Sequence, residues 1–419
     1  MVAKEILDSL IFQKGLKIFG AGHDLTSQRS ASFNYEQQVY LGALLDPAFN
    51  TNLQTILETL EIDLIFLAHD EWIYYFRDID FIHGVRICKH PAETIRIVSF
   101  KSETYRKLQH LNITPKVYES LNTISSFPCI MKPDRGQGSK GFQIINNSFE
   151  LESLVHNGLE LDKYIISEFL PGAEYTIDCF TDEKGSLLVA STRLRAEIEE
   201  GLSISTELVN LPELTLFATR LNSEIHFVGP WFFQVKLDKS DSPKLLEVGC
   251  RVAGASGIQR AIGINFSLLW THMALGDSIN VCRNSLMPVR SILPKNLLIL
   301  GMTFDKIYVD FDDCLVINHQ INLGLLNFLK YAGNLDIQIV LISRHKGNLI
   351  YRLEEMEIKD IFKEIIHILD DSKKSSFMTK GQNILFIDDS FSERPDTIIW
   401  PNVQSVDPSI FIDKVVFFL

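Results

Sequence analysis

The segment from Phe127 to Phe142 combines glycines and cations in a way that suits a bound polyphosphate. An apolar run ends at Lys132, and the glycines, cations and hydroxyl that follow are Arg135, Gly136, Gly138, Ser139, Lys140 and Gly141. Glycines let backbone N–H groups turn toward an anion and let the chain approach it closely. The GxxxxGK[ST] pattern of a P-loop is missing. The sequence therefore predicts a phosphate-binding loop of another kind.

Polar oxygens also occur within or directly after apolar runs further along the chain. Glu168 follows such a run, and Glu174 comes after a Pro-Gly turn. Gln234 and Glu247 each lie inside an apolar run, and Arg251 follows four residues after Glu247. An acid in a buried strand needs a metal or a cation as its partner, and Gln and Glu oxygens suit Mg²⁺. These positions are candidate ligands of a magnesium ion.

Taken in chain order, these features resemble the ATP-grasp superfamily, in its carbamoyl-phosphate-synthase-like and carboxylate–amine ligase branch, over residues 1 to about 290. The segment Phe127–Gly141 is similar to the family's glycine-rich motif, and His69–Glu71 resembles its strand-end motif in the first domain. The resemblance implies an ATP site formed by Lys101, Lys132, Arg135, Gly136, Gly138, Ser139, Gly141, Glu168 and Glu174. It also implies that Gln234 and Glu247 bind Mg²⁺ and that Arg251 steadies the transferred phosphoryl group.

The resemblance implies transfer of the γ-phosphoryl group of ATP to a carboxylate, attack of an amine on the acyl phosphate, and release of ADP and phosphate. One position departs from the family pattern, because its acid-x-Asn-x-Arg motif has Gly249 where the asparagine stands. The second metal position therefore lacks a ligand or takes one from elsewhere. Two alternatives stay open: a kinase that phosphorylates a hydroxyl, and a non-catalytic module that senses ATP and controls the rest of the chain.

A second group of polar residues follows three apolar runs near the end of the chain. Asp310 and Asp312 follow the first run, Ser343 ends the second, and Asp388 and Asp389 follow the third. Lys373 and Lys374 lie between the second and third runs. Because α/β proteins bind ligands at the carboxyl ends of parallel strands, these side chains are predicted to form one site.

This group resembles the haloacid-dehalogenase-like (HAD) superfamily over about residues 303–419. The resemblance implies that Asp310 is a nucleophile that forms an aspartyl phosphate, with Asp312 as general acid and base. It assigns the phosphoryl oxygens to Ser343 and charge stabilisation to Lys374 or Lys373. The implied Mg²⁺ ligands are Asp310, Asp312, Asp388 and Asp389. Cys314 stands where the family commonly has threonine.

The spacing within this second group leaves no room for a large cap domain. Ser343 follows Asp310 by 33 residues, and Lys374 follows Ser343 by 31. A capless site is open, so either its substrate is large or the ATP-grasp half serves as its lid. The whole chain is then predicted to be a bifunctional enzyme, an ATP-dependent ligase fused to a magnesium-dependent phosphatase.

Short apolar runs that alternate with helical patterns predict an α/β and α+β fold. We expect a Rossmann-like domain over residues 1–92, a two-lobed ATP-grasp domain over 93–295, and a capless HAD-like doubly wound parallel sheet over 303–419. The junction is apolar at Leu297–Leu300, which predicts that the two halves are docked. Strands are predicted at 16–19, 63–67, 164–169, 174–180, 187–190, 231–237, 244–248, 307–311, 337–343 and 384–387, with a strand pair within 127–145. Helices are predicted at 52–60, 213–221, 321–331 and 348–356.

Composition limits the partners of this 419-residue chain, which is 46% hydrophobic and 22% charged. The net charge of −13 argues against a nucleic-acid partner, and no apolar run is long enough to cross a membrane. The six cysteines lack zinc-site spacing, which predicts buried thiols and a reducing cytoplasm. The expected ligands are ATP, Mg²⁺ at both sites, and a small carboxylate and amine, which can be phosphorylated. Oligomeric state is left open, with a homodimer as one option.

Overall fold

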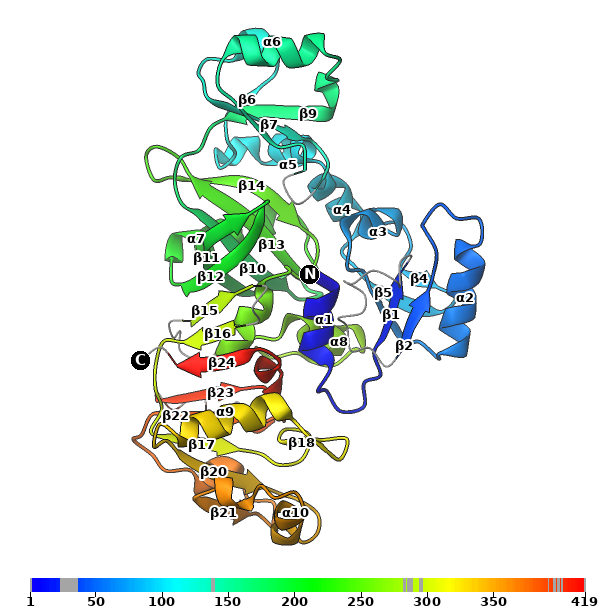
Figure 1. The fold of residues 1–419 in the computed structure, drawn as a ribbon. Helices are drawn as coiled ribbons and strands as arrows, with labels where there is room; N and C mark the ends of the chain where they lie inside the picture. The colour runs from blue at the N-terminus through cyan, green and yellow to red at the C-terminus, as the bar shows by residue number, and fades with distance from the viewer. Residues whose placement is uncertain are drawn as a thin grey trace.

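The computed structural model describes residues 2–22, 37–136, 140–281, 284, 289–293, 297–390, 392–394, 397, 400 and 402–417. Figure 1 shows a small lobe in cyan, a large central sheet in green, and a further sheet in yellow to red. The amino-terminal region, in blue, lies beside the central sheet. No helix among the described residues is long and apolar enough to span a bilayer.

The amino-terminal region carries two small sheets instead of one Rossmann-like sheet, as far as the chain is described. In one sheet β1 (Phe19–Gly22) pairs in parallel with β2 (Gln37–Tyr40), and the other has the order β3 (Leu64–Phe66), β5 (Val85–Cys88), β4 (Phe81–Ile82). The helices are α1 (Val2–Leu10), α2 (Phe49–Thr59), α3 (Asp70–Tyr75) and α4 (Ala92–Ser99). The strand predicted from Leu16 begins only at Phe19, where its pairing with β2 starts, and Leu16 and Ile18 pack against the largest apolar cluster of the described residues.

The small lobe is an antiparallel sheet that holds the glycine-rich loop in a hairpin. Its strand order is β6 (Val117–Tyr118), β9 (Tyr164–Glu168), β7 (Cys129–Pro133), β8 (Gln143–Ile145), and its helices are α5 (Lys101–Leu108) and α6 (Ser148–His156). The loop connects β7 to β8, as the sequence predicts. Cys129, Met131 and Ile145 are fully buried, so the base of the hairpin is anchored in a small apolar core.

The large sheet contains the strands that carry the candidate metal ligands. Its order is β14 (Pro243–Gly249), β13 (Gly229–Leu237), β10 (Glu174–Thr181), β11 (Leu187–Glu199), β12 (Leu202–Val209), β15 (Val289–Ile292), β16 (Leu297–Leu300), β24 (Lys414–Phe417). Its helices are α7 (Pro212–Glu224) and α8 (Phe266–Ala274). The predicted apolar face of α7 is buried, including Leu214 and Phe217. β11 continues to Glu199, past the predicted end at Ala190, because it pairs with both β10 and β12.

The carboxy-terminal region is a fully parallel five-stranded sheet, as predicted. Its order is β21 (Glu364–His367), β20 (Gln338–Ser343), β17 (Lys306–Val309), β22 (Ile384–Ile387), β23 (Val403–Val406). The helices are α9 (Leu323–Gly333) and α10 (Leu349–Glu355), and a hairpin joins β18 (Val316–Ile317) to β19 (Gln320–Ile321). Between Asp310 and Lys374 the chain forms only this hairpin, α9, β20, α10, β21 and the short 3₁₀ helix Lys359–Ile361, so no further domain is inserted there.

The two halves of the chain share a sheet. β24, the last strand, leaves the parallel sheet and pairs in parallel with β16 of the large sheet (Figure 1). The Asn284 side chain also donates to the Ser405 carbonyl oxygen at 2.7 Å and accepts from the Ser405 N–H at 2.9 Å. The halves are therefore docked, as the apolar junction predicts. The cysteines within the described residues are buried and free.

Two candidate active sites

The glycine-rich loop is anchored to the first turn of α5. The Asp134 carboxylate accepts hydrogen bonds from the Ser102 backbone N–H and hydroxyl, both at 2.7 Å. The Lys101 ammonium group donates to the carbonyl oxygens of Pro133 at 3.2 Å and Gly136 at 3.3 Å. Burial lowers the pKa of Lys101, while the nearby charge of Glu247 opposes the shift. Lys101 and the loop therefore lie together, as predicted for a phosphate site.

Lys132 extends from the small lobe to the large sheet. Its ammonium group donates to the Tyr105 hydroxyl at 2.9 Å and to the Leu246 carbonyl oxygen at 3.2 Å. Burial lowers the pKa of Lys132 to about 8, against the opposing charges of Glu247 and Glu174. Tyr105 was not a sequence candidate, because a tyrosine in an amphipathic helix carries no motif. The contact with Leu246 places Lys132 of the small lobe near Glu247 and Glu174 of the large sheet.

The predicted magnesium ligands lie opposite each other on neighbouring strands. Gln234 of β13 and Glu247 of β14 are direct partners in the antiparallel ladder. The Gln234 side-chain oxygen accepts a hydrogen bond from Arg195 at 3.0 Å. Glu174 of the adjacent strand β10 forms an ion pair with Arg195 and lies 3.6 Å from the Lys236 ammonium. Gln234 and Glu247 therefore carry side-chain oxygens, the ligands that a divalent cation prefers, on adjacent strands, and a cation bound there would take the Gln234 oxygen from Arg195.

Glu168 lies where the small lobe joins the large sheet. It is the last residue of β9, and its carboxylate accepts from the Lys116 N–H at 2.8 Å. The Glu168 N–H donates to the Lys116 carbonyl oxygen at 2.9 Å. The segment after Glu168 leads directly into β10 of the large sheet. The structure therefore puts this acid at the connection between the lobes.

Only part of the glycine-rich loop lies within the described residues. Gly138 and Ser139 lie outside the described residues. Gly141 has φ +75, and a Cβ there would lie 2.8 Å from Pro133 Cγ, so only glycine fits this position. Arg135 lies over the Tyr74 ring of α3, 4.1 Å from its centroid. Arg135 therefore contacts the amino-terminal region. The sequence predicted a phosphate-binding role for Arg135 and did not predict this contact.

Arg251 is held by the amino-terminal region. Its Nε donates to one carboxylate oxygen of Asp70 at 2.6 Å, and its Nη2 donates to the other at 3.1 Å. Arg251 is buried, and its guanidinium carbon lies 5.1 Å from the centroid of the Phe232 ring. The His69–Glu71 motif thus supplies the partner of Arg251. The sequence identified the motif. It did not predict the contact with Arg251, because the two residues are 181 positions apart and no local pattern links them.

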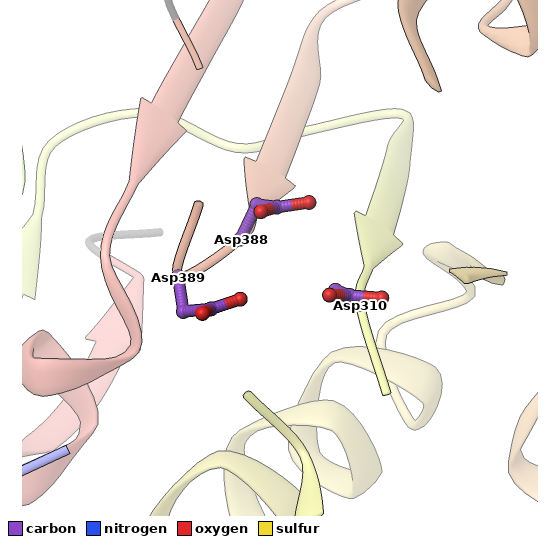
Figure 2. Close-up of side chains that lie close together, drawn as sticks. All are labelled: Asp310, Asp388 and Asp389. Atoms are coloured by element: carbon purple, nitrogen blue, oxygen red, sulfur yellow. The ribbon is translucent and has the colours of Figure 1, made fainter. Parts of the chain in front are cut away.

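Three acids meet at the carboxyl edge of the parallel sheet. Asp310 follows β17, and Asp388 and Asp389 follow the neighbouring strand β22 (Figure 2). One oxygen from each carboxylate lies within 4.8 Å of the others. The Lys374 ammonium lies 2.9 Å from Asp310 Oδ2 and 2.7 Å from Asp388 Oδ2. Of the two lysines left open by the sequence, Lys374 is therefore the one that contacts both acids.

The electrostatics of this cluster favour a bound cation. Burial, with repulsion from Asp310, raises the pKa of Asp388 to about 7, and burial with repulsion from Asp388 does the same for Asp389. Burial also raises the pKa of Asp310. Burial alone would lower the pKa of Lys374, but the charges of Asp310 and Asp388 outweigh burial and raise it. Asp310 Oδ1 is buried without a hydrogen-bond partner, so a magnesium ion fits this donor set.

Ser343 and Asp312 flank the acids from two sides. Ser343 ends β20, the other neighbour of β17, and its hydroxyl accepts from the His345 N–H at 3.2 Å. Both Asp312 carboxylate oxygens lie 3.0 Å from His345 Nδ1. Asp312 lies outside the three-acid group, and its role as a ligand of the metal stays a prediction. His345 was missed, although its place two residues after Ser343 could have suggested it.

Comparison with protein-family models identifies part of the chain. Residues 98–219 match the ATP-grasp domain, and residues 160–292 match the family described as ATP-grasp in the biosynthetic pathway with Ter operon. These two segments are therefore similar to ATP-grasp domains. Both matches end before residue 293. The carboxy-terminal site is therefore described from the positions of its side chains alone, without support from a family model. No curated protein matches the chain.

Solved structures of low sequence identity share the fold. The biotin carboxylase domain of Hydrogenobacter thermophilus 2-oxoglutarate carboxylase, a dimer solved with MgADP and bicarbonate, has a TM-score of 0.58 and 10% identity, covering 70% of this chain and 72% of that one. L-amino acid ligase from Bacillus licheniformis has a TM-score of 0.54 and 18% identity, covering 72% and 78%. N5-carboxyaminoimidazole synthetase from Staphylococcus aureus, solved with ADP, has a TM-score of 0.53 and 14% identity, covering 70% and 79%.

Proposed function

We propose that this chain is an ATP-dependent ligase that joins a small carboxylate to an amine through an acyl phosphate. One observation carries the proposal: Gln234 and Glu247 are paired across β13 and β14, and the Lys132 ammonium of the other lobe donates to the carbonyl oxygen of Leu246, the residue before Glu247. Oxygen ligands on one side and lysines on the other suit a magnesium nucleotide between the lobes. The similarity of residues 98–219 to ATP-grasp domains and the fold likeness to the L-amino acid ligase support this proposal.

Each residue has a role that follows from its position. Lys101 and Lys132 bind phosphate oxygens, and a bound anion keeps the Lys132 ammonium protonated near neutral pH. Gln234 and Glu247 hold Mg²⁺, which neutralises charge on the phosphates when bound. Glu168 and Glu174 face the nucleoside, Arg251 steadies the phosphoryl group in transfer, and the glycine-rich loop keeps water from the acyl phosphate.

The ligase is tested by replacing one metal ligand. Glu247→Gln should lower ADP formation at least about 100-fold, because it removes the carboxylate that neutralises the magnesium nucleotide. ADP release is measured with panels of carboxylates and amines, phosphorylated and unphosphorylated. Glu199→Gln, an exposed change at the end of β11, is the matched control and should leave the rate unchanged.

The products separate the ligase from its alternatives. ADP release that requires an amine supports the ligase. A stable phosphorylated product formed without an amine identifies a kinase, and ATP binding without turnover identifies a sensor. ADP release that survives in Glu247→Gln would contradict the assignment of Glu247 as a ligand.

We propose a second activity for the carboxy-terminal region, a magnesium-dependent phosphatase of the HAD type. The observation that favours it is the group Asp310, Asp388 and Asp389 with Lys374 at one sheet edge. The Asp310 carboxylate attacks the phosphorus of a phosphate ester, and the alcohol leaves with a proton from Asp312. Water then hydrolyses the aspartyl phosphate, which regenerates the carboxylate and releases inorganic phosphate.

The phosphatase is tested at its nucleophile. Asp310→Asn should abolish hydrolysis of p-nitrophenyl phosphate, because an amide oxygen is a poor nucleophile, and should leave ADP formation intact. A chelator should also stop hydrolysis, and added Mg²⁺ should restore it. Asp336→Asn is the matched control, since Asp336 is exposed and its φ of +62 suits asparagine as well. If ester hydrolysis persists in Asp310→Asn, Asp310 is not the nucleophile.

A further inference from the structure

Gly249 leaves no space for a metal-binding side chain. Glu247 and Gly249 are two residues apart on β14, so they face the same side of the sheet, opposite Gln234 and Phe232 of β13. A Cβ at position 249 would lie 2.3 Å from Phe232 Cε1 and 2.5 Å from Phe232 Cζ. The Phe232 side chain is 5% exposed, so its ring is packed and cannot swing into solvent. The aromatic ring fills the volume that a side-chain ligand at 249 would need.

A fixed cation lies against the same ring. Arg251 stacks on Phe232 and is held at two points by Asp70. A guanidinium group that donates two N–H groups from one edge to a carboxylate has little freedom to move. The face of the sheet therefore continues from Gln234 and Glu247 to an aromatic ring and a fixed arginine, instead of to further oxygen ligands.

We propose that the nucleotide site of this chain holds one divalent cation, between Gln234 and Glu247, where the resemblance implied two. The proposal rests on the proposed nucleotide site and goes further, because it assigns the number of ions. The residues present do not fit a second ion, since Gly249 offers no oxygen and Phe232 blocks its replacement. Lys101, Lys132 and Arg251 supply the remaining positive charge toward the phosphates.

The number of ions can be measured without turnover. The full chain is saturated with Mn²⁺ in the presence and absence of adenylyl imidodiphosphate, a non-hydrolysable ATP analogue. The difference in bound Mn²⁺ counts only the ions that enter with the nucleotide, because the three-acid site is filled in both samples. We expect a difference of one Mn²⁺ per chain and an electron paramagnetic resonance spectrum without coupling between nucleotide-site ions.

A paired substitution reopens the blocked position. Gly249→Asn combined with Phe232→Ala removes the ring and adds an amide oxygen, and should raise the difference to two Mn²⁺ per chain. The control Phe232→Ala alone should stay at one, because it adds no ligand. Circular dichroism and analogue affinity confirm that each variant is folded.

The outcomes distinguish this proposal from the ligase on which it rests. Two coupled ions in the unaltered chain would overturn the single-ion site while leaving the nucleotide site intact. A count that stays at one in the folded double variant would overturn the role of Phe232. Failure of the analogue to bind at all would overturn both the nucleotide site and the single ion.

Discussion

At the scale of single residues, three buried arginines of the large sheet are held by acids. Arg193 pairs with Asp178 at 2.7 Å, Arg195 with Glu174, and Arg251 with Asp70. Of these arginines, the sequence singled out Arg251, as the residue that steadies the transferred phosphoryl group. Their partners were not readable, because a buried guanidinium needs a counter-charge that any distant part of the chain can supply. Residue types were thus predictable, while pairings depended on the fold.

Asp70 is predicted to position Arg251 for the ligase reaction. Asp70→Asn removes the charge and one acceptor oxygen of the two-point contact, and hydrogen bonds to charged groups contribute about 1.5–3 kcal/mol. We expect kcat for ADP formation to fall about 10- to 100-fold, with a smaller change in the KM for ATP. Steady-state kinetics over a range of ATP concentrations measures the two parameters separately.

The neighbouring acid provides the control for Asp70. Glu71 is exposed on the same helix, so Glu71→Gln should keep the parent kcat. Asp70→Glu, which retains the carboxylate, should recover part of the rate. An equal loss in both neutral variants would point to damage of α3 as a whole, and an unchanged kcat in Asp70→Asn would show that Arg251 needs no partner.

At the scale of elements, local sequence patterns predicted individual strands and the buried faces of helices. The strand at Ile384–Ile387 was predicted residue for residue, because a short β-rich apolar run ends at two acids. The buried face of α7 followed from its helical spacing. β24 was not predicted. Its partner β16 lies more than 100 residues away, and the sequence of neither strand shows which distant strand it pairs with.

The candidate sites were predictable to the same extent. Acids that follow apolar runs, such as Asp310 and Asp388, were assigned because a strand end fixes their location at the sheet edge. His345 and Tyr105 were missed, since each acts through a contact with another element. Asp134 was not a sequence candidate, yet its carboxylate accepts from the Ser102 N–H in the first turn of α5 and so anchors the start of the loop.

At the scale of the whole molecule, polar contacts hold the amino-terminal region against the rest. Glu5 of α1 forms a buried ion pair with Arg260, and Gln13 donates to Asp407 at 3.1 Å. Lys14 lies 3.0 Å from Asp313, which directly follows the Asp310–Asp312 segment. The amino-terminal segment thus contacts both the large sheet and the edge of the parallel sheet, in agreement with docked halves.

His90 makes this assembly sensitive to acid. It is fully buried, its Nδ1 accepts from the Val228 N–H at 3.2 Å, and its Nε2 therefore carries the proton and donates to the Pro230 carbonyl oxygen at 2.9 Å. Burial lowers the pKa of His90 to about 4. The neutral ring links the amino-terminal region to the start of β13.

This geometry predicts a loss of stability in mild acid. The folded pKa lies below the unfolded value of about 6.5, so the unfolded chain binds more protons between pH 6.5 and pH 4. The contribution of His90 to the free energy of unfolding is complete above pH 6.5 and should fall by about 3 kcal/mol in total as the pH drops through this window, while the raised pKa values of Asp388 and Asp389 act in the opposite direction in every variant. Urea unfolding at pH 7 and pH 4.5 should show a smaller fall for His90→Gln, whose side chain does not titrate. His156→Gln, at an exposed position of α6, should keep the parent fall, and an equal fall in His90→Gln would place the acid sensitivity elsewhere.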